Sequence, residues 1–260
     1  LAIVDQLNGG VTQCTIVPGV SYGSIKMASS SSWGTTADLK IKPEISAPGD
    51  GVYSAIGTDT DTSYASWRGT SMATPHISAA LSIIKQRLRE IFPDATAATI
   101  NELAYAFAMS TANQANGFVR QQGAGLIDIV KAISSDVYLS VPNSSRPKLE
   151  VGESEDGAFT FTFVLNNIGD VDHTYSISVK ALTEQISTEV YDGHWTHEEE
   201  PTEVNLISGT IYDVSGMVTN NAPATVTVPA GGTAPVTMTI AANAALMSYF
   251  DEYFTVGSFL

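Results

Sequence analysis

The sequence has one cysteine, Cys14, among 260 residues, so it can form neither an intrachain disulfide bond nor a cluster of thiolate metal ligands. No apolar run approaches the roughly 18 residues that a membrane-spanning helix needs. Basic residues are also few: 12 Lys and Arg stand against 27 Asp and Glu, for a net charge of -15. This imbalance argues against nucleic acid or an anionic membrane surface as a partner, because both are bound by clustered Lys and Arg.

The charge and the texture of the sequence both change near Ser134–Asp136. Residues 1–135 hold 10 acidic and 9 basic side chains, whereas residues 136–260 hold 17 acidic and 3 basic ones. Hydrophobic residues make up 43% of the chain, a proportion typical of a folded protein. We therefore predict two domains, 1–135 and 136–260.

Residues 1–135 have the pattern of a mixed α/β domain. Apolar residues recur at helical spacing over 70–91, and Pro93 ends this pattern. Two further helices are predicted at 96–110 and 125–134, and two short strands at 11–17 and 41–47.

Residues 136–260 have an all-β pattern. Apolar residues alternate with polar ones at 158–165, 174–179, 224–229 and 234–240. The last two stretches are separated by Ala230, Gly231 and Gly232, which predicts a hairpin. About seven short strands over roughly 120 residues predict a β-sandwich.

The stretch that suggests chemistry is Gly69-Thr-Ser-Met-Ala-Thr-Pro-His-Ile-Ser78. A serine at the start of a long helix presents its hydroxyl near free backbone N–H groups and the positive end of the helix dipole. Such surroundings stabilise the oxyanion that forms when a serine attacks a carbonyl carbon. The structural alternative is an ordinary Ser or Thr N-cap with Pro75 in the first turn, and spacing alone favours it.

Gly69–Ser78 resembles the nucleophile motif of the subtilisin-like serine proteases. The resemblance places Ser71 at the catalytic serine, with its backbone N–H in the oxyanion hole. It gives supporting positions to Gly69, Thr70, Met72, Pro75 and His76. Three other stretches resemble elements of the same family: the Ser-x-x-Gly element at Ser31–Gly34, the Ala-Pro-Gly turn at Leu39–Gly49 and the Gly-x-Gly segment at Gln122–Asp128. The fold implied for residues 1–135 is the C-terminal part of a doubly wound α/β catalytic domain.

The second domain resembles a fibronectin type III-like module. Asn166–Asp170 is similar to the Asn-x-Gly turn of that module, and Thr227–Gly232 is similar to its later hairpin. A subtilisin-like domain followed by such a module resembles the cell-envelope proteases of Gram-positive bacteria, the lactocepin and C5a-peptidase group. Residues 1–28 are interpreted as the end of the protease-associated insertion of that group. The resemblance implies an extracellular or cell-wall location, although the sequence contains no signal peptide.

Two members of the catalytic triad have no match in this sequence. In subtilisin-like enzymes the Asp and the His precede the Ser along the chain, but residues 1–70 contain no histidine. The Asp-Thr-Gly and His-Gly-Thr motifs of the family are also absent, and Asn8 is a poor match for the oxyanion-hole asparagine. Since a serine without its base is a poor nucleophile, we predict that this chain alone has no useful peptidase activity.

None of the four histidines fits the missing base. His76 lies five residues after Ser71 on the same predicted helix, which turns it away from the hydroxyl, so we give it a structural role. His173 lies beside a predicted strand and is interpreted as a surface residue. His194 and His197 form a cluster that could bind a metal, with a solvated acidic loop as the alternative.

Calcium is the cofactor that the sequence leaves open. Asp50, Asp59 and Asp61 could bind it together with backbone carbonyls, but their spacing is generic and surface solvation is the alternative. No redox or nucleotide cofactor is implied.

The leading interpretation is a fragment of a secreted or cell-wall serine endopeptidase that acts on proteins or peptides. The chain begins with Leu1 and ends in Tyr253–Leu260, which has the pattern of a strand cut short, so we interpret it as a cloned or processed piece. The missing Asp and His would come from an upstream segment, in the same polypeptide or as a separate chain. The other hypothesis is a non-catalytic surface-binding module.

Overall fold

The computed structural model describes residues 25–254, apart from 39, 58–62, 116, 152–153, 155 and 192–201. Its helices are α2 (Thr70–Ile91), α3 (Ala97–Ser110), α4 (Val119–Gln122), α5 (Ile129–Ser134) and α6 (Ala244–Phe254). Its strands are β1 (Val52–Ala55), β2 (Tyr64–Trp67), β3 (Val137–Ser140), β4 (Ala158–Asn167), β5 (His173–Ser176), β6 (Leu182–Tyr191), β7 (Thr202–Asp213), β8 (Val218–Asn220), β9 (Thr225–Val228) and β10 (Thr233–Ala242). The predicted strand at 11–17 lies outside the described residues.

The two long helices follow their predicted bounds. α2 covers residues 70–91, and the N–H of Phe92 donates a hydrogen bond to the carbonyl of Leu88 at 2.8 Å where the helix ends. α3 begins after Thr96, whose side chain accepts a hydrogen bond from the N–H of Thr99 at 3.1 Å. This is the usual pairing of a threonine N-cap, so the local sequence sets where α3 starts.

The third helix is shorter than predicted, because α5 starts at Ile129 and not at Gly125. Gly123 and Gly125 have φ values of 65° and 120°, which side-chain-bearing residues rarely adopt and a helix does not contain. Asp128 is the N-cap and accepts a hydrogen bond from the N–H of Lys131 at 3.0 Å. The short helix α4, which was not predicted, ends at the first of these glycines.

The predicted strand at 41–47 is reduced to one parallel bridge between Ser46 and Leu126. The N–H of Ser46 donates to the carbonyl of Gly125 at 2.9 Å, and the N–H of Ile127 donates to the carbonyl of Ser46 at 2.9 Å. The segment that follows α4 therefore lies beside the segment that precedes β1.

The strands that follow α5 form three antiparallel sheets in the described residues. The largest has the order β3-β4-β10-β8, and the other two are the pairs β5–β9 and β6–β7. β4 and β10 pair over nine residues, and two pairs of opposed threonines link their hydroxyls: Thr160 with Thr239 at 2.8 Å and Thr162 with Thr237 at 2.7 Å. The alternating pattern at 158–165 thus correctly predicts a strand.

The predicted hairpin across Ala230–Gly232 is wrong. β9 pairs with β5, whereas β10 pairs with β4 and β8, so the turn carries the chain from one sheet to another. Hydrogen bonds hold this turn against the preceding loop: the N–H of Gly231 donates to the carbonyl of Gly169 at 2.8 Å, and the N–H of Ala230 donates to Asp172 at 2.9 Å. These contacts with a distant loop set the position of the turn, and a local hairpin signal in the sequence cannot predict them.

The strand-like interpretation of Tyr253–Leu260 is also wrong for the part that the structure describes. Tyr253 and Phe254 are the last residues of α6, a helix of 11 residues that follows β10. Residues 255–260 lie outside the described part.

Each half of the described chain has its own hydrophobic core. The helical core takes buried residues from α2, α3 and α5: Leu81, Ile84, Leu88, Ile100, Ala104, Phe107, Ala108 and Ala132. The second core takes them from β3, β4, β9 and β10: Val137, Leu165, Val228, Ala234 and Val236. Two of the sheets therefore share one core.

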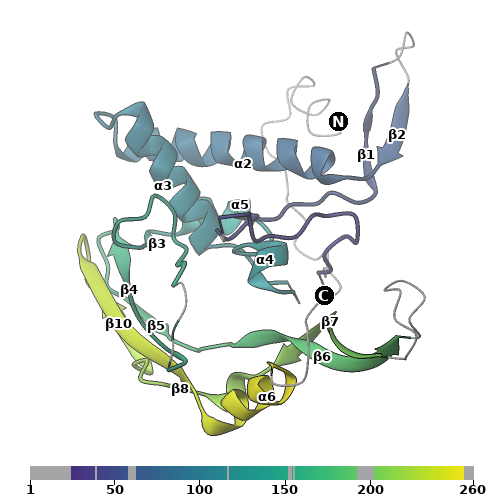
Figure 1. The fold of residues 1–260 in the computed structure, drawn as a ribbon. Coiled ribbons are helices and arrows are strands. Elements are labelled where there is room, and N and C mark those ends of the chain that lie inside the picture. Colours follow the sequence, from purple (N-terminus) through teal and green to yellow (C-terminus); the bar gives the residue numbers. More distant parts are fainter. Residues whose placement is uncertain are drawn as a thin grey trace.

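Strand β3 joins the two halves. The rings of Phe107 and Tyr138 lie 5.0 Å apart, and the N–H of Leu139 donates to the hydroxyl of Ser110 at 2.8 Å. Figure 1 places β3 beside α3, while the β1–β2 hairpin stands at the opposite end of α2. In the part of the chain that the structure describes, no helix is both long enough and apolar enough to cross a membrane.

Candidate functional site

Ser71 lies in the first turn of α2 and is exposed. The turn before it is fixed by two glycines in contact, since the N–H of Gly69 donates to the carbonyl of Gly49 at 2.7 Å. A Cβ atom on Gly49 would lie 2.9 Å from the carbonyl oxygen of Gly69 and 3.3 Å from the Cβ of Ala73. The Ala-Pro-Gly turn therefore needs glycine where it touches the helix.

The start of α2 leaves polar groups free beside Ser71. The N–H groups of Met72 and Ala73 donate to the carbonyl of Gly69 at 3.0 and 3.4 Å. Among the described residues, no hydrogen bond is recorded for the N–H groups of Thr70 and Ser71 or for the Ser71 hydroxyl. Free N–H groups at a helix start favour a developing negative charge on oxygen. The ordinary Ser or Thr N-cap is ruled out, because the N-cap is Gly69 and no side chain caps the helix.

Two pockets flank this turn. One, of about 470 Å³, is lined by β1, by β2 and by the side of α2 that carries Ser71, Pro75 and His76. The other, of about 520 Å³, is lined by segments around Ser31 and Gly49 and by Thr70. Ser71 therefore has open space beside it that a peptide or another part of a protein could occupy.

The stretches that resemble subtilisin-like elements come together around this end of α2. The N–H of Gly34 donates to the carbonyl of Arg120 at 2.8 Å, which ties the Ser31–Gly34 stretch to α4. The Ser46–Leu126 bridge joins the other two stretches. Motifs that are far apart in the sequence thus surround one turn.

His76 has its own partner on α2. Its Nδ1 atom lies 2.8 Å from the carbonyl oxygen of Met72, four residues earlier. No hydrogen bond between His76 and Ser71 is recorded in the described part of the chain. This geometry favours the structural role that the sequence predicts for His76.

The remaining histidines and carboxylates that the structure describes form no second cluster. His173 was predicted to be a surface residue, but it is half-buried. It begins β5, and its Nε2 atom is buried without a hydrogen-bond partner. Asp50 is exposed and lies 4.0 Å from Arg68. Within the described residues, no three His, Cys, Asp or Glu side chains gather as a metal site would require. The other candidates, Asn8, Asp59, Asp61, His194 and His197, lie outside those residues.

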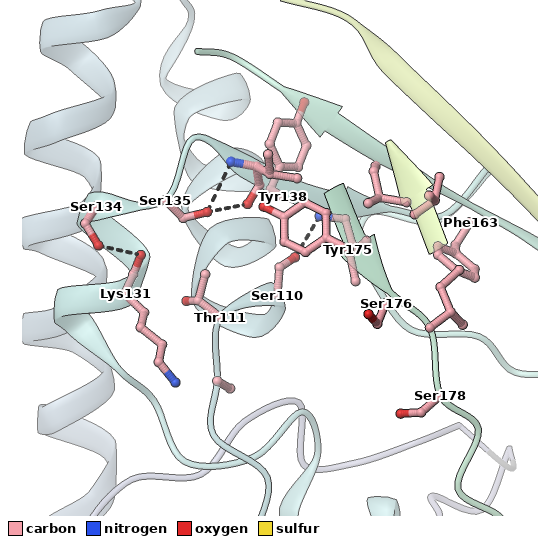
Figure 2. Close-up of a pocket in the computed structure, with 16 residues that line it drawn as sticks. Ser110, Thr111, Lys131, Ser134, Ser135, Tyr138, Phe163, Tyr175, Ser176 and Ser178 are labelled. Carbon is pink, nitrogen blue, oxygen red and sulfur yellow. Dashed lines mark hydrogen bonds between the residues drawn. The ribbon is translucent and has the colours of Figure 1, made fainter. Parts of the chain in front are cut away.

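A pocket of about 610 Å³ at the junction of the two halves was not anticipated from the sequence (Figure 2). Several of its hydroxyls bind the backbone: Ser110 accepts from the N–H of Leu139 at 2.8 Å, and Ser135 donates to the carbonyl of Val137 at 2.7 Å. Burial raises the pKa of Tyr138, and burial together with the nearby charge of Asp136 raises the pKa of Tyr175. Both phenols therefore stay neutral near pH 7.

Each half of the chain matches a known protein family. Residues 9–125 match the Subtilase family, and residues 149–256 match an Fn3-like domain. The chain thus combines a subtilase region with an Fn3-like domain, in agreement with the resemblances carried by the motifs around Ser71 and by Asn166–Asp170 and Thr227–Gly232.

The individual relatives belong to the same group of proteases. The PI-type proteinase of Lactococcus lactis subsp. cremoris is 27% identical over 266 residues, which cover 95% of this chain and 13% of that protein. The C5a peptidase of Streptococcus pyogenes serotype M6 is 32% identical over 152 residues, which cover 56% of this chain and 12% of that protein. The predicted resemblance to this group is confirmed. The chain spans only about 13% of the length of such relatives.

Proposed function

We propose that residues 1–135 are the nucleophile-bearing part of a subtilisin-like serine endopeptidase. Ser71 is the nucleophile, and its backbone N–H forms part of the oxyanion hole. Gly69, Thr70, Met72, Pro75 and His76 shape the turn. The substrate is a protein or peptide, and the site of action is the cell wall or the extracellular space, as suggested by the relatives.

One observation carries this proposal: an exposed serine hydroxyl lies at the start of a long helix, beside two free N–H groups and two pockets. This is the arrangement that acyl transfer through serine requires. A general base and its orienting carboxylate must complete it. Because no histidine precedes Ser71, the chain alone is inactive, and an upstream segment supplies both groups.

Exposed apolar side chains on the β1–β2 hairpin and on α2 support a missing covering segment. Tyr53 is 71% exposed, Trp67 is 55% exposed, and Ile83 on α2 is 44% exposed. Large exposed apolar surfaces commonly mark interfaces. An upstream segment that completes a doubly wound sheet over this face would cover them, whether it is part of the same polypeptide or a processed chain that stays bound.

The domain assignment belongs to the same proposal. We place the boundary between the subtilase part, residues 1–135, and a fibronectin type III-like sandwich, residues 136–260. Residues 1–28 are assigned to the end of a protease-associated insertion. Two sheets that share one core support the sandwich.

The test is covalent labelling with a fluorophosphonate, which reacts with activated serines. We expect no labelling of the 260-residue chain alone, and labelling when the preceding segment of the parent gene product is present in the same polypeptide. The variant Ser71→Ala should abolish that labelling. Ser78→Ala is the matched control, because Ser78 lies on the same helix and its hydroxyl donates to the carbonyl of Thr74.

Two results would overturn the proposal. Ser71-dependent hydrolysis by the chain alone would refute the requirement for an upstream base. Absence of labelling in the extended polypeptide would favour a non-catalytic binding module.

A further inference from the structure

The Fn3-like domain and the segment that leads into it bind both backbone polar groups of one residue of the subtilase region. The N–H of Ile41 donates to Oε1 of Glu150 at 2.8 Å, and Nζ of Lys148 donates to the carbonyl of Ile41 at 2.8 Å. Lys148 and Glu150 also pair with each other at 3.1 Å. We call this group of three residues the Ile41 clamp. It joins segments that are 107 and 109 residues apart in the sequence.

Charged groups on both sides stabilise the clamp. The Lys148 side chain is only 16% exposed, and a lysine that is withdrawn from water needs anionic partners. Besides Glu150, it faces Glu44 at 3.8 Å, and Glu44 is in turn paired with Lys42. The hydrogen bond from Ile41 and the charges of Lys148 and Lys40 lower the pKa of Glu150, while its slight burial opposes this. Glu150 is therefore ionised at neutral pH.

The other end of the clamped segment reaches the turn at Ser71. Residues 40–49 lie against the stretch after α4, where the N–H of Ala124 donates to the carbonyl of Glu44 at 2.9 Å. A Cβ atom on Gly123 would come within 2.3 Å of the Glu44 carbonyl, so the two backbones are in direct contact. The segment ends at Gly49, whose carbonyl accepts the hydrogen bond of Gly69 at 2.7 Å.

We propose that Lys148 and Glu150 are positioning residues for the turn that carries Ser71. They fix the 40–49 segment at Ile41, and that segment fixes Gly69 at Gly49. Neither side chain touches Ser71. The region after residue 135 thereby contributes to the geometry of the nucleophile, and only the importance given to Ser71 rests on the proposed function.

Hydrogen exchange on the 260-residue chain tests this coupling without any activity assay. We expect Glu150→Ala to speed exchange of the Ile41 amide about tenfold, since a hydrogen bond to a charged group is lost. Exchange at Gly69 should rise by about threefold or more, because local opening spreads along the segment. Lys148→Met should act in the same direction. Exchange at Phe107, in the helical core, reports global unfolding and should not change.

Asp170→Ala is the matched control. Asp170 is an exposed carboxylate of the same half of the chain, and no ion pair or hydrogen bond of its side chain is recorded within the described residues. It should leave exchange at both Ile41 and Gly69 unaltered. Faster exchange at Ile41 alone, with Gly69 as in the wild type, would overturn the proposal, because the clamp would then join the two halves without positioning the nucleophile. An unchanged Ile41 amide would overturn it as well. Failure of the fluorophosphonate labelling would leave these exchange results intact, so the two proposals can fail separately.

Discussion

The two ends of α2 differ in what covers them. Toward its C-terminus, Ile84 and Leu88 are completely buried against α3 and α5. Toward its N-terminus, Ser71, Pro75 and Ala79 are exposed and line an open pocket. One helix is therefore anchored in a hydrophobic core at one end and presents Ser71 at an exposed, open surface at the other.

This contrast separates the residues that stabilise the chain from those that would perform chemistry. Packing at the buried end holds the helix in place, so the exposed end can carry polar groups without partners. Substitutions along α2 should accordingly have very different costs, according to the end at which they fall.

The largest expected effect comes from two neighbouring isoleucines. Ile84 is 0% exposed and Ile83 is 44% exposed, so that the same truncation can be made at a buried and an exposed site of one helix. We expect Ile84→Ala to lower the free energy of unfolding by about 2–5 kcal/mol, because it removes buried methyl groups and leaves a cavity. Ile83→Ala should cost about 0.5 kcal/mol or less. Urea denaturation of both variants measures this, and equal losses would contradict the described burial.

The next effect concerns the ion pair that joins the buried end of α2 to the start of β3. Arg87 bonds the carbonyl of Ser135 at 2.8 Å and the carboxylate of Asp136 at 3.0 Å, and its side chain is only 19% exposed. We expect Arg87→Met to cost about 1.5–3 kcal/mol, because it leaves these acceptors without their charged donor. Arg89→Met, at an exposed position two residues further on, is the control and should cost far less. If chemical denaturation shows similar losses of unfolding free energy for the two variants, the Arg87–Asp136 ion pair does not hold the two halves together.

The third effect concerns the exposed, N-terminal end of α2. Gly49→Ala would force a methyl group to within 2.9 Å of the Gly69 carbonyl, and we expect it to cost about 1–3 kcal/mol through overpacking. Gly216→Ala is the control, since a methyl group there would meet nothing within 4 Å and its φ is not positive. Thermal unfolding of the pair distinguishes them. A neutral Gly49→Ala would show that the turn before Ser71 can move away.

Local signals in the sequence predict the two long helices well and the long-range pairings poorly. The Thr96 N-cap and the stop at Pro93 lie within a few residues of the helix ends that they fix, so both α2 and α3 are placed correctly. The start of α5 is misplaced because Gly123 and Gly125 serve contacts with Glu44 and Asn113, which no local pattern reveals.

The same limit applies to the candidate site. The motif around Ser71 is contiguous in the sequence, so it predicts the start of α2 correctly, and the role of Ser71 as nucleophile stays a prediction. The predicted hairpin at Ala230–Gly232 fails because alternation predicts strands but not their partners. The Ile41 clamp was missed for the same reason: a lysine and a glutamate at 148 and 150 look like surface residues until Ile41 is brought next to them.

The smallest expected effect is the loss of stability at low pH near the buried, C-terminal end of α2. Asp128 caps α5, which packs against that end through Ala132. Partial burial opposes ionisation, but hydrogen bonds from the Lys131 N–H and from Asn113 outweigh it and lower the pKa of Asp128 below its ordinary value of 3.8. A carboxyl of this kind stabilises the fold above its unfolded pKa, and the contribution is lost as the pH falls through the lower folded value.

We therefore expect the free energy of unfolding to decline as the pH falls below about 4, and Asp128→Asn, which keeps a capping oxygen but cannot titrate, to decline less steeply. Urea denaturation between pH of about 6 and about 2.5 measures both slopes. Superimposable slopes would mean that Asp128 has the same pKa in the folded and unfolded chains. Since α5 packs on the buried end of α2 among the described contacts, hydrogen exchange at Gly69 should respond to this titration less than exchange at Leu88, which would sharpen the contrast between the two ends of the helix.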